Sequence, residues 1–254
     1  MASQPMDLDH HYSPSRWSHR MGADEVIKAH IKSLKDGSEA AKQGNLDCEI
    51  GFPYGESENE RLDIFGAQTL PGVNMAEIIR QVTKAVSFVL TMATRRGSSG
   101  VYLCGHSAGG HLAAMMLAHN WMDTCMVGPS LIRGAVLVSG VYDLTPIVST
   151  SDAVQHSPIT HIDNITQYSQ NRRILVAFGD HDPPEFQRQS TEFNTSLIQG
   201  GIHSAMMIVP DCDHFNVIEN LQKEDYILTQ ETLRIMGLNV GNILETMDKA
   251  SISN

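Results

Sequence analysis

The chain has 254 residues, 41% of them hydrophobic, which is enough apolar material to bury one sizeable core. Eighteen basic side chains against 29 acidic ones give a net charge of −11, which disfavours binding to nucleic acid or to anionic membranes. The four cysteines include no C-x-x-C pair and no run of about 18 apolar residues occurs, so we expect a cytoplasmic protein without disulfides or membrane spans, with a nuclear fraction left open.

The first half of the chain predicts two long helices with short strands between them. Residues Ala23–Gln43 follow a helical period, because apolar side chains recur there at spacings of three and four. Two strand-like runs come next, Cys48–Tyr54 and Arg61–Phe65. A second amphipathic helix is expected from about Asn74 to Thr94, and Gly97 is expected to end it.

The second half alternates strands and helices, which is typical of a mostly parallel sheet. The apolar runs Arg133–Ser139 and Arg173–Phe178 are continuous, as expected for strands that are buried on both faces. Further elements expected here are a strand at Ser204–Val209, helices at Glu185–Ile198 and Asn216–Met236, and a loop-rich segment at Ser151–Gln170. We therefore predict an α/β fold with helices on both faces of the sheet. It forms a single domain over residues 1–254, of which 239–254 are a frayed extension.

Residues 105–109 carry the motif that points most directly to chemistry. They read Gly105-His106-Ser107-Ala108-Gly109 and lie between an apolar run and a helical pattern. A G-x-S-x-G sequence between strand and helix is typical of a nucleophile elbow, and glycines on both sides of the serine let the chain turn sharply. Ser107 is therefore the candidate nucleophile. The amide of Ala108, in the first turn of the helix, is the candidate oxyanion donor.

A nucleophilic serine needs a general base and a group that orients this base, and in such folds both follow later strands in the order Asp, His. His214 comes directly after the strand expected at residues 204–209 and is the candidate base. Asp180 and Asp182 both follow the preceding strand. We favour Asp182, because it clears the strand end and precedes Pro183-Pro184, which stiffens the loop. A turn-capping role for either aspartate stays open.

The same two loops also offer a metal-binding alternative. Acidic and histidine residues crowd them, namely Asp180, His181, Asp182, Asp211, Asp213 and His214. No H-E-x-x-H or comparable ligand spacing occurs, and a serine elbow needs no metal. We therefore expect neither a metal nor a cofactor.

Several further phrases of the sequence are distinctive, namely Tyr12–Arg20, Tyr54–Glu56, Tyr102–Gly109, Leu137–Leu144, His181–Asp182 with Pro184–Phe186, and Asp213–Phe215 with Ile218–Leu221. Taken together, these phrases resemble the kynurenine formamidase (arylformamidase) family, α/β-hydrolases of tryptophan catabolism. The resemblance implies hydrolysis of N-formyl-L-kynurenine to formate and L-kynurenine by a triad of Ser107, Asp182 and His214. It also implies a homodimer.

The chain departs from the family pattern before the second long helix. Family members carry a His-Gly-Gly-Tyr-Trp loop after the third strand, which supplies further oxyanion amides, and then a helix and a fourth strand. The residues between Phe65 and Asn74 are too few for these, since average strands take about 5 to 6 residues and helices about 11. We expect a sheet without the third and fourth strands, an oxyanion hole reduced to Ala108, and impaired activity. The chain must then re-pair its exposed strand edges, cover them by oligomerisation, or be unstable.

Three functional interpretations follow. The first is a serine amidase acting on N-formyl-L-kynurenine, slowed by the missing oxyanion loop. The second is an inactive splice or gene-model variant that serves only as a binding or regulatory protein. The third is a general carboxylesterase of the same fold. Tyr142 and the segment after Ser151 are candidates, by position alone, for holding the substrate's amino-acid end.

Overall fold

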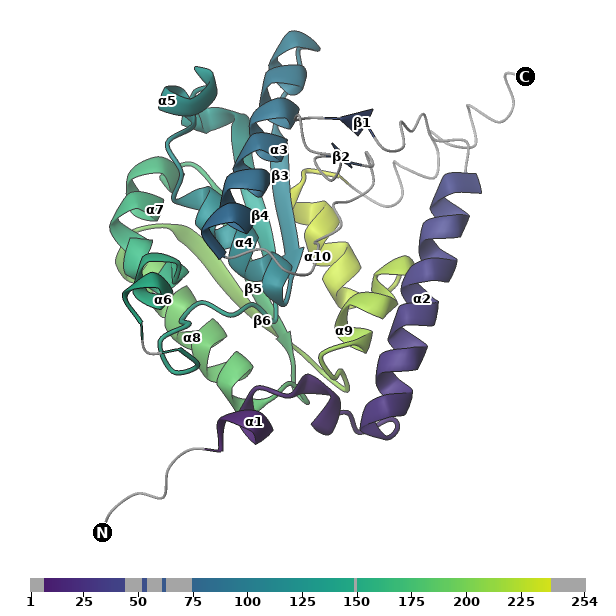
Figure 1. The fold of residues 1–254 in the computed structure, drawn as a ribbon. Coiled ribbons are helices and arrows are strands. Elements are labelled where there is room, and N and C mark those ends of the chain that lie inside the picture. Colours follow the sequence, from purple (N-terminus) through teal and green to yellow (C-terminus); the bar gives the residue numbers. More distant parts are fainter. Residues whose placement is uncertain (1–6, 44–51, 54–60, 63–74, 149, 239–254) are drawn as a thin grey trace, which may run out of the picture.

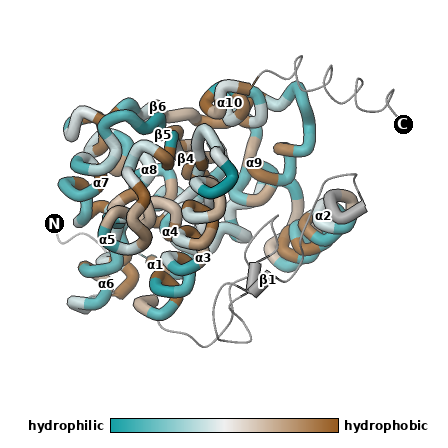
Figure 2. The backbone as a smooth tube through the Cα atoms, turned by 90° about the horizontal axis from the view of Figure 1, so that it is seen from above, coloured by the Kyte–Doolittle hydropathy of each residue, from teal (hydrophilic) through white to brown (hydrophobic). Residues whose placement is uncertain are grey.

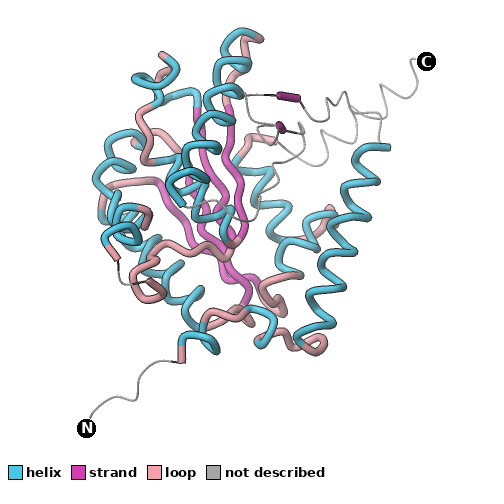
Figure 3. The backbone as a smooth tube through the Cα atoms, viewed as in Figure 1, coloured by secondary structure: helices cyan, strands magenta, loops and turns pink. Residues whose placement is uncertain are grey.

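A parallel sheet forms the centre of the molecule. The computed structural model describes residues 7–43, 52–53, 61–62, 75–148 and 150–238. Within this part of the chain the main sheet has four parallel strands in the order β3-β4-β5-β6. Their bounds are Val101–His106 (β3), Ile132–Val138 (β4), Arg173–Gly179 (β5) and His203–Val209 (β6). Figure 3 shows them side by side, and the prediction of a mostly parallel sheet is confirmed.

Helices cover both faces of this sheet (Figure 1). Their bounds are Leu8–His11 (α1), Ala23–Gln43 (α2), Met75–Arg95 (α3), Ala108–Leu117 (α4), Trp121–Cys125 (α5), Ser151–Gln155 (α6), Ile162–Ser169 (α7), Pro184–Gln199 (α8), Asn216–Glu219 (α9) and Ile227–Ile235 (α10). Short 3-10 helices lie at Pro14–Arg16, Pro129–Leu131, Pro158–His161 and Asn220–Gln222. A separate antiparallel pair joins Phe52–Pro53 (β1) to Arg61–Leu62 (β2). No helix in the described ranges is long and apolar enough to cross a membrane.

Alternate side chains of the central strands enter two hydrophobic clusters. Ala135 and Leu137 of β4 point to the cluster that α3, α4, α7 and α8 cover, whereas Val136 and Val138 point to the cluster beneath α9 and α10. The alternation follows from the period of two in a strand. Six of the seven residues of β4 are buried, as the continuous apolar run predicts for a strand covered on both faces.

The strand before the elbow lies at the edge of the main sheet. Within the described residues β3 pairs with β4 alone, and its other side has no strand partner. Only Leu103 of this strand is buried, and Cys104 is exposed. A strand in the middle of a parallel sheet is covered on both faces. The edge position therefore agrees with the expectation that the family's third strand is missing from this chain.

Helix α2 keeps an apolar stripe on its surface. Ile27, Ile31 and Leu34 recur at spacings of four and three and are 42%, 47% and 49% exposed, whereas Val26 is fully buried. Figure 2 shows α2 set apart from the layer of helices around the sheet. The helical period predicted this helix with its observed bounds. The apolar face that revealed the helix is, however, largely uncovered by the described residues.

Two sequence-based predictions were wrong. Residues 151–170 are not loop-rich but hold α6, a 3-10 turn and α7. Helix α6 begins after its N-cap Thr150, whose hydroxyl accepts a hydrogen bond from the Ala153 amide. The helix predicted over Asn216–Met236 is broken, because Lys223 and Tyr226 adopt extended backbone between α9 and α10.

The remaining elements match their predictions closely. Strand and helix bounds in the second half agree to within a few residues, and Gly97 adopts a φ of +67° just after α3. Most of the predicted strands Cys48–Tyr54 and Arg61–Phe65 lies outside the described residues, as does the extension over residues 239–254.

Candidate active site

The serine of the elbow holds a strained backbone conformation. Ser107 lies between β3 and α4 with φ 55° and ψ −121°, a region that side-chain-bearing residues rarely adopt. Such a residue costs on the order of 1–3 kcal/mol and persists only where its surroundings enforce it. Its amide donates to the carbonyl of Val138 at 2.9 Å, and its hydroxyl makes no capping bond to α4. The hydroxyl of Ser107 is therefore not engaged in capping the helix that follows it.

The turn requires one glycine of the motif and not the other. A Cβ on Gly105 would lie 2.0 Å from the carbonyl oxygen of Gly109, so no side chain fits there. A Cβ on Gly109 would meet nothing within 4 Å. The prediction that glycines on both sides of the serine allow the turn is therefore wrong for Gly109. The close approach on the helix side is at Gly110, where a Cβ would lie 3.0 Å from the Cα of Gly140.

A buried carboxylate holds the candidate base. Asp182 Oδ1 lies 2.6 Å from Nδ1 of His214, and the two side chains are 0% and 4% exposed. Asp182 Oδ2 accepts from the hydroxyl of Ser139 at 2.6 Å and from the amide of Gly179 at 2.9 Å. A carboxylate only accepts, so the proton between the two groups lies on Nδ1, and Nε2 is the nitrogen that carries the lone pair in the neutral form of the ring. This arrangement can accept a proton from a nucleophile.

The second aspartate of that loop has a structural role. Asp180 is exposed, and its two carboxylate oxygens accept from the amides of Asp211 and Cys212, each at 3.1 Å. It thus braces the turn after β6, a role that the sequence left open for either aspartate. The structure brings Asp182, and not Asp180, to His214.

His106 connects the elbow to the loop of the base. Its Nε2 lies 2.8 Å from the backbone carbonyl of His214, and the ring centroids of the two histidines are 4.5 Å apart. Burial, and then the nearby His214, lower the pKa of His106 well below its ordinary value, so the ring is neutral. The carbonyl can only accept, and therefore Nε2 of His106 carries the proton. The structure shows no direct hydrogen bond between Ser107 and His214.

The N-terminal segment clamps the loop of the base, which sequence reasoning missed. Asp213 is fully buried and accepts from the hydroxyl of Ser18 at 2.6 Å and from Nε of Arg20 at 2.9 Å. The amides of Phe215 and Asn216 also donate to it. Burial alone would raise the pKa of Asp213, but the bonds from Arg20, Ser18 and the amides lower it to about 2.

The clamp continues to the helix that follows this segment. Arg20 donates to Glu219 at 3.1 Å, and Nδ1 of His30 on α2 lies 2.8 Å from the same carboxylate. His30 in turn packs against Phe215, with ring centroids 5.1 Å apart. One indication in the sequence that Arg20 matters was its place within a phrase typical of the family. That phrase did not indicate which residue Arg20 contacts or what it does.

Two further candidates occupy different environments. Ala108 is the first residue of α4, and the first four amides of a helix have no partner within it, so its N–H is available to an oxyanion. Tyr142, by contrast, is 1% exposed and stacks on Phe193 with ring centroids 4.2 Å apart. This side chain belongs to the core, and its suggested contact with substrate is not supported.

The fold and the elbow together define an α/β-hydrolase. In agreement, the sequence profile of the Prolyl oligopeptidase family matches residues 74–234, from α3 to α10. The chain belongs to the kynurenine formamidase family. It is 36% identical to a kynurenine formamidase of Salmo salar and 34% identical to one of Danio rerio, and each match covers 91% of this chain and 96% of the relative.

A solved structure shows the same fold. A protein of Silicibacter sp. described as a thioesterase candidate superposes with a TM-score of 0.63 at 22% sequence identity, over 88% of this chain and 97% of its own. At this identity the similarity concerns the fold alone.

The match to the fish relative also measures how much shorter this chain is. The alignment spans 287 positions, but 91% of 254 residues is only about 231, so about 56 aligned positions have no residue in this chain. A strand, a helix and a second strand of average length together need fewer residues than this. The shortfall agrees with the four-stranded sheet of the described residues, in which the elbow strand forms an edge.

Proposed function

We propose that this chain is a serine amidase that hydrolyses N-formyl-L-kynurenine to L-kynurenine and formate, at a reduced rate. The observation that carries the proposal is the strained Ser107 at the elbow, together with the buried Asp182–His214 pair at the ends of the neighbouring strands. The substrate class comes from the relatives, which are named kynurenine formamidase.

In the proposed first half-reaction, Ser107 Oγ attacks the formyl carbon. His214 Nε2 takes the hydroxyl proton, and Asp182 stabilises the imidazolium that forms. The oxyanion of the tetrahedral intermediate accepts a hydrogen bond from the Ala108 amide, near the positive end of α4. The C–N bond then breaks, and His214 gives its proton to the departing aryl nitrogen, which releases kynurenine.

In the second half-reaction, water hydrolyses the formyl ester on Ser107. His214 removes a proton from the water as it attacks the ester carbon, and then returns that proton to Ser107 Oγ as formic acid leaves, which ionises to formate in water. Both half-reactions use only side chains and amides of this chain. The Ser139 and Gly179 bonds to Asp182 keep the carboxylate aimed at Nδ1 throughout.

The missing block sets the expected rate. Removing one oxyanion donor costs about 2.7–4 kcal/mol of transition-state stabilisation in a well-studied serine hydrolase, a factor of about 100 to 1000 in kcat. We therefore propose that this chain turns over about 100- to 1000-fold more slowly than a relative with the complete oxyanion loop. We also propose that the chain is cytoplasmic and forms a homodimer, in which the partner covers part of the β3 edge or the exposed apolar side chains of α2. Light scattering on the purified chain tests whether it is a dimer.

Kynurenine release from N-formyl-L-kynurenine tests the activity. Purified chain with a folded circular dichroism spectrum is compared with Ser107→Ala, with the control Ser99→Ala before β3, and with the Salmo salar relative. The expected result is slow turnover that Ser107→Ala abolishes and Ser99→Ala retains. Folded wild type no faster than Ser107→Ala would identify the chain as an inactive relative, and cleavage of aryl esters but not of the formyl amide would identify a carboxylesterase.

A further inference from the structure

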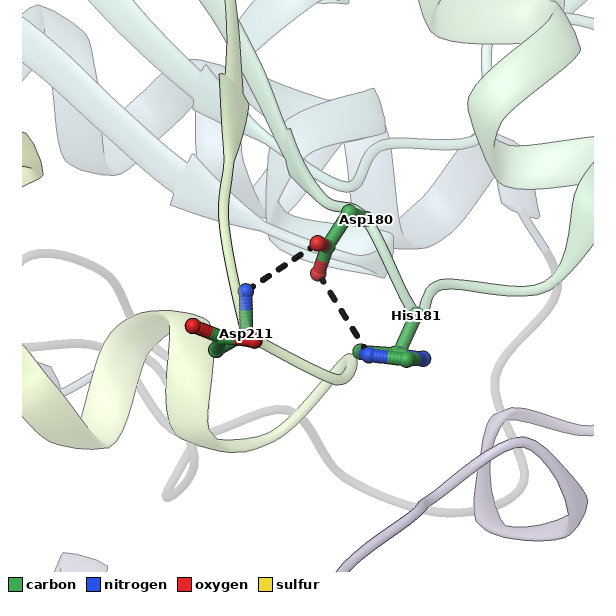
Figure 4. Close-up of side chains that lie close together, drawn as sticks. All are labelled: Asp180, His181 and Asp211. Atoms are coloured by element: carbon green, nitrogen blue, oxygen red, sulfur yellow. Dashed lines mark hydrogen bonds and ion pairs between the residues drawn. The ribbon is translucent and has the colours of Figure 1, made fainter.

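A second group of polar side chains lies beside the proposed catalytic pair. Asp180 and His181 follow β5, Asp211 follows β6, and one candidate ligand atom from each lies within 4.8 Å of the other two. Figure 4 shows the three side chains gathered where these two loops meet. All three are exposed, whereas Asp182 and His214, which the sequence placed in the same crowded group, are buried and paired with each other.

The backbone holds these donors in place. The amide of Asp180 donates to Val209 at 3.0 Å, and the amide of His181 donates to Cys212 at 2.9 Å. In return, the carboxylate of Asp180 accepts from the amides of Asp211 and Cys212. The two loops are therefore joined in both directions. Preorganised donors lower the ordering cost that a ligand must otherwise meet.

The side chains keep free capacity for a ligand. Each oxygen of Asp180 accepts one amide and has a second lone pair. His181 Nε2 lies 3.9 Å from Asp180 Oδ1, too far for a hydrogen bond, so the ring nitrogens are not committed to this carboxylate. His19 supplies a second imidazole close by, with its ring centroid 4.1 Å from that of His181.

We propose that Asp180, His181 and Asp211 bind a divalent transition-metal ion of the zinc class, which ties the loop of Asp182 to the loop of His214. An imidazole with two carboxylates is a donor set that Zn²⁺ accepts, and three protein ligands leave a fourth position for water. Magnesium and calcium prefer oxygen donors alone. The ion is a tie between loops and not a reactant, so its binding does not depend on the proposed amidase activity. The site departs from the sequence-based expectation of no metal.

Calorimetric titration of the purified full chain with Zn²⁺ tests this site. We expect one ion per chain and a Zn²⁺-dependent rise in Tm. His181→Gln and Asp211→Asn should each weaken Zn²⁺ binding by about 10- to 100-fold or more. This is the loss seen in metal sites when a residue that only hydrogen-bonds a ligand is replaced, and loss of a ligand itself should cost at least as much. Asparagine tolerates the φ of 55° at residue 211, so Asp211→Asn preserves the turn. His203→Gln, an exposed histidine at the far end of β6, is the matched control and should retain the wild-type affinity.

Several outcomes would overturn the proposal. No Zn²⁺ binding by folded wild type is one, and binding that survives both His181→Gln and Asp211→Asn is another. Loss of binding in Cys104→Ser instead would assign the ion to that exposed thiol. Equal affinity for Mg²⁺ and Zn²⁺ would contradict the assignment to a transition metal. A loss of affinity in His19→Gln as well would support the proposal with a fourth ligand.

Discussion

Replacing Arg20 by methionine should destabilise the protein through the loop of the base. Arg20 makes two bonds to the fully buried Asp213, and breaking a buried ion pair costs about 3–5 kcal/mol where no other partner remains. Asp213 keeps Ser18 and two backbone amides. We therefore expect a loss of about 2 kcal/mol in the free energy of unfolding at neutral pH, since the remaining donors cover part of the charge.

The pH dependence of this loss gives a second check. The pKa of Asp213 is lowered in the folded protein from an ordinary 3.8 to about 2, so its pairing stabilises the fold fully above about pH 4. That contribution disappears as the pH falls through about 2. The difference in stability between wild type and Arg20→Met should therefore shrink between pH 4 and pH 2, and stay constant above pH 5.

Urea unfolding followed by tryptophan fluorescence measures both effects, because the chain has two tryptophans, the buried Trp121 and Trp17 in the same segment as Arg20. Arg16→Met is the matched control in the same segment, because Arg16 pairs with Asp9 at 2.7 Å on the surface, with side chains 48% and 72% exposed. Exposed pairs contribute about 0–1 kcal/mol. The reasoning is refuted if Arg20→Met costs no more than Arg16→Met, or if its cost is unchanged at pH 2.

Three further predictions concern the elbow and its partners. Asp182→Asn should lower kcat by about 10⁴-fold with the fold intact, because the asparagine amide imposes the wrong tautomer on His214. Burst kinetics on an activated aryl ester measure this loss of kcat, and a loss of less than tenfold would contradict the prediction. Gly105→Ala should lower the free energy of unfolding by about 1–3 kcal/mol or more, whereas Gly109→Ala should leave it unchanged or raise it. Thermal unfolding measures both variants, and equal effects would contradict the reasoning from the space around each glycine. His106→Gln should lower kcat several-fold with KM unchanged, because the hydrogen bond from His106 to the carbonyl of His214 is worth about 1 kcal/mol. A change in KM alone would argue against a positioning role for His106.

The elements that position the site could be predicted from the sequence because their signals are local. The strand before Ser107 and the helix after it follow from a continuous apolar run and a motif of five residues. Asp182 and His214 follow strands directly, and the ends of parallel strands meet at one edge of the sheet. Chain order was therefore enough to bring these three residues into one hypothesis.

Short helices and distant ion pairs could not be predicted in this way. Helices α6 and α7 have five and eight residues, too few to display a helical period clearly. The Arg20–Asp213 bond joins positions 193 residues apart, and no local pattern encodes it. The exposed stripe on α2 shows a further limit, because periodicity predicts an apolar face and not what covers it.

Labelling with an aryl fluorophosphonate tests the role of Ser107 most directly, because it needs only the attack of the serine and not complete turnover. Ser107 Oγ should attack phosphorus and expel fluoride, and mass spectrometry of the digested protein should find one adduct, on the peptide that contains Ser107. Labelling should disappear in Ser107→Ala and slow strongly in His214→Ala. Folded wild-type protein that stays unlabelled, or that carries the label on another residue, would contradict the assignment of Ser107 as the nucleophile.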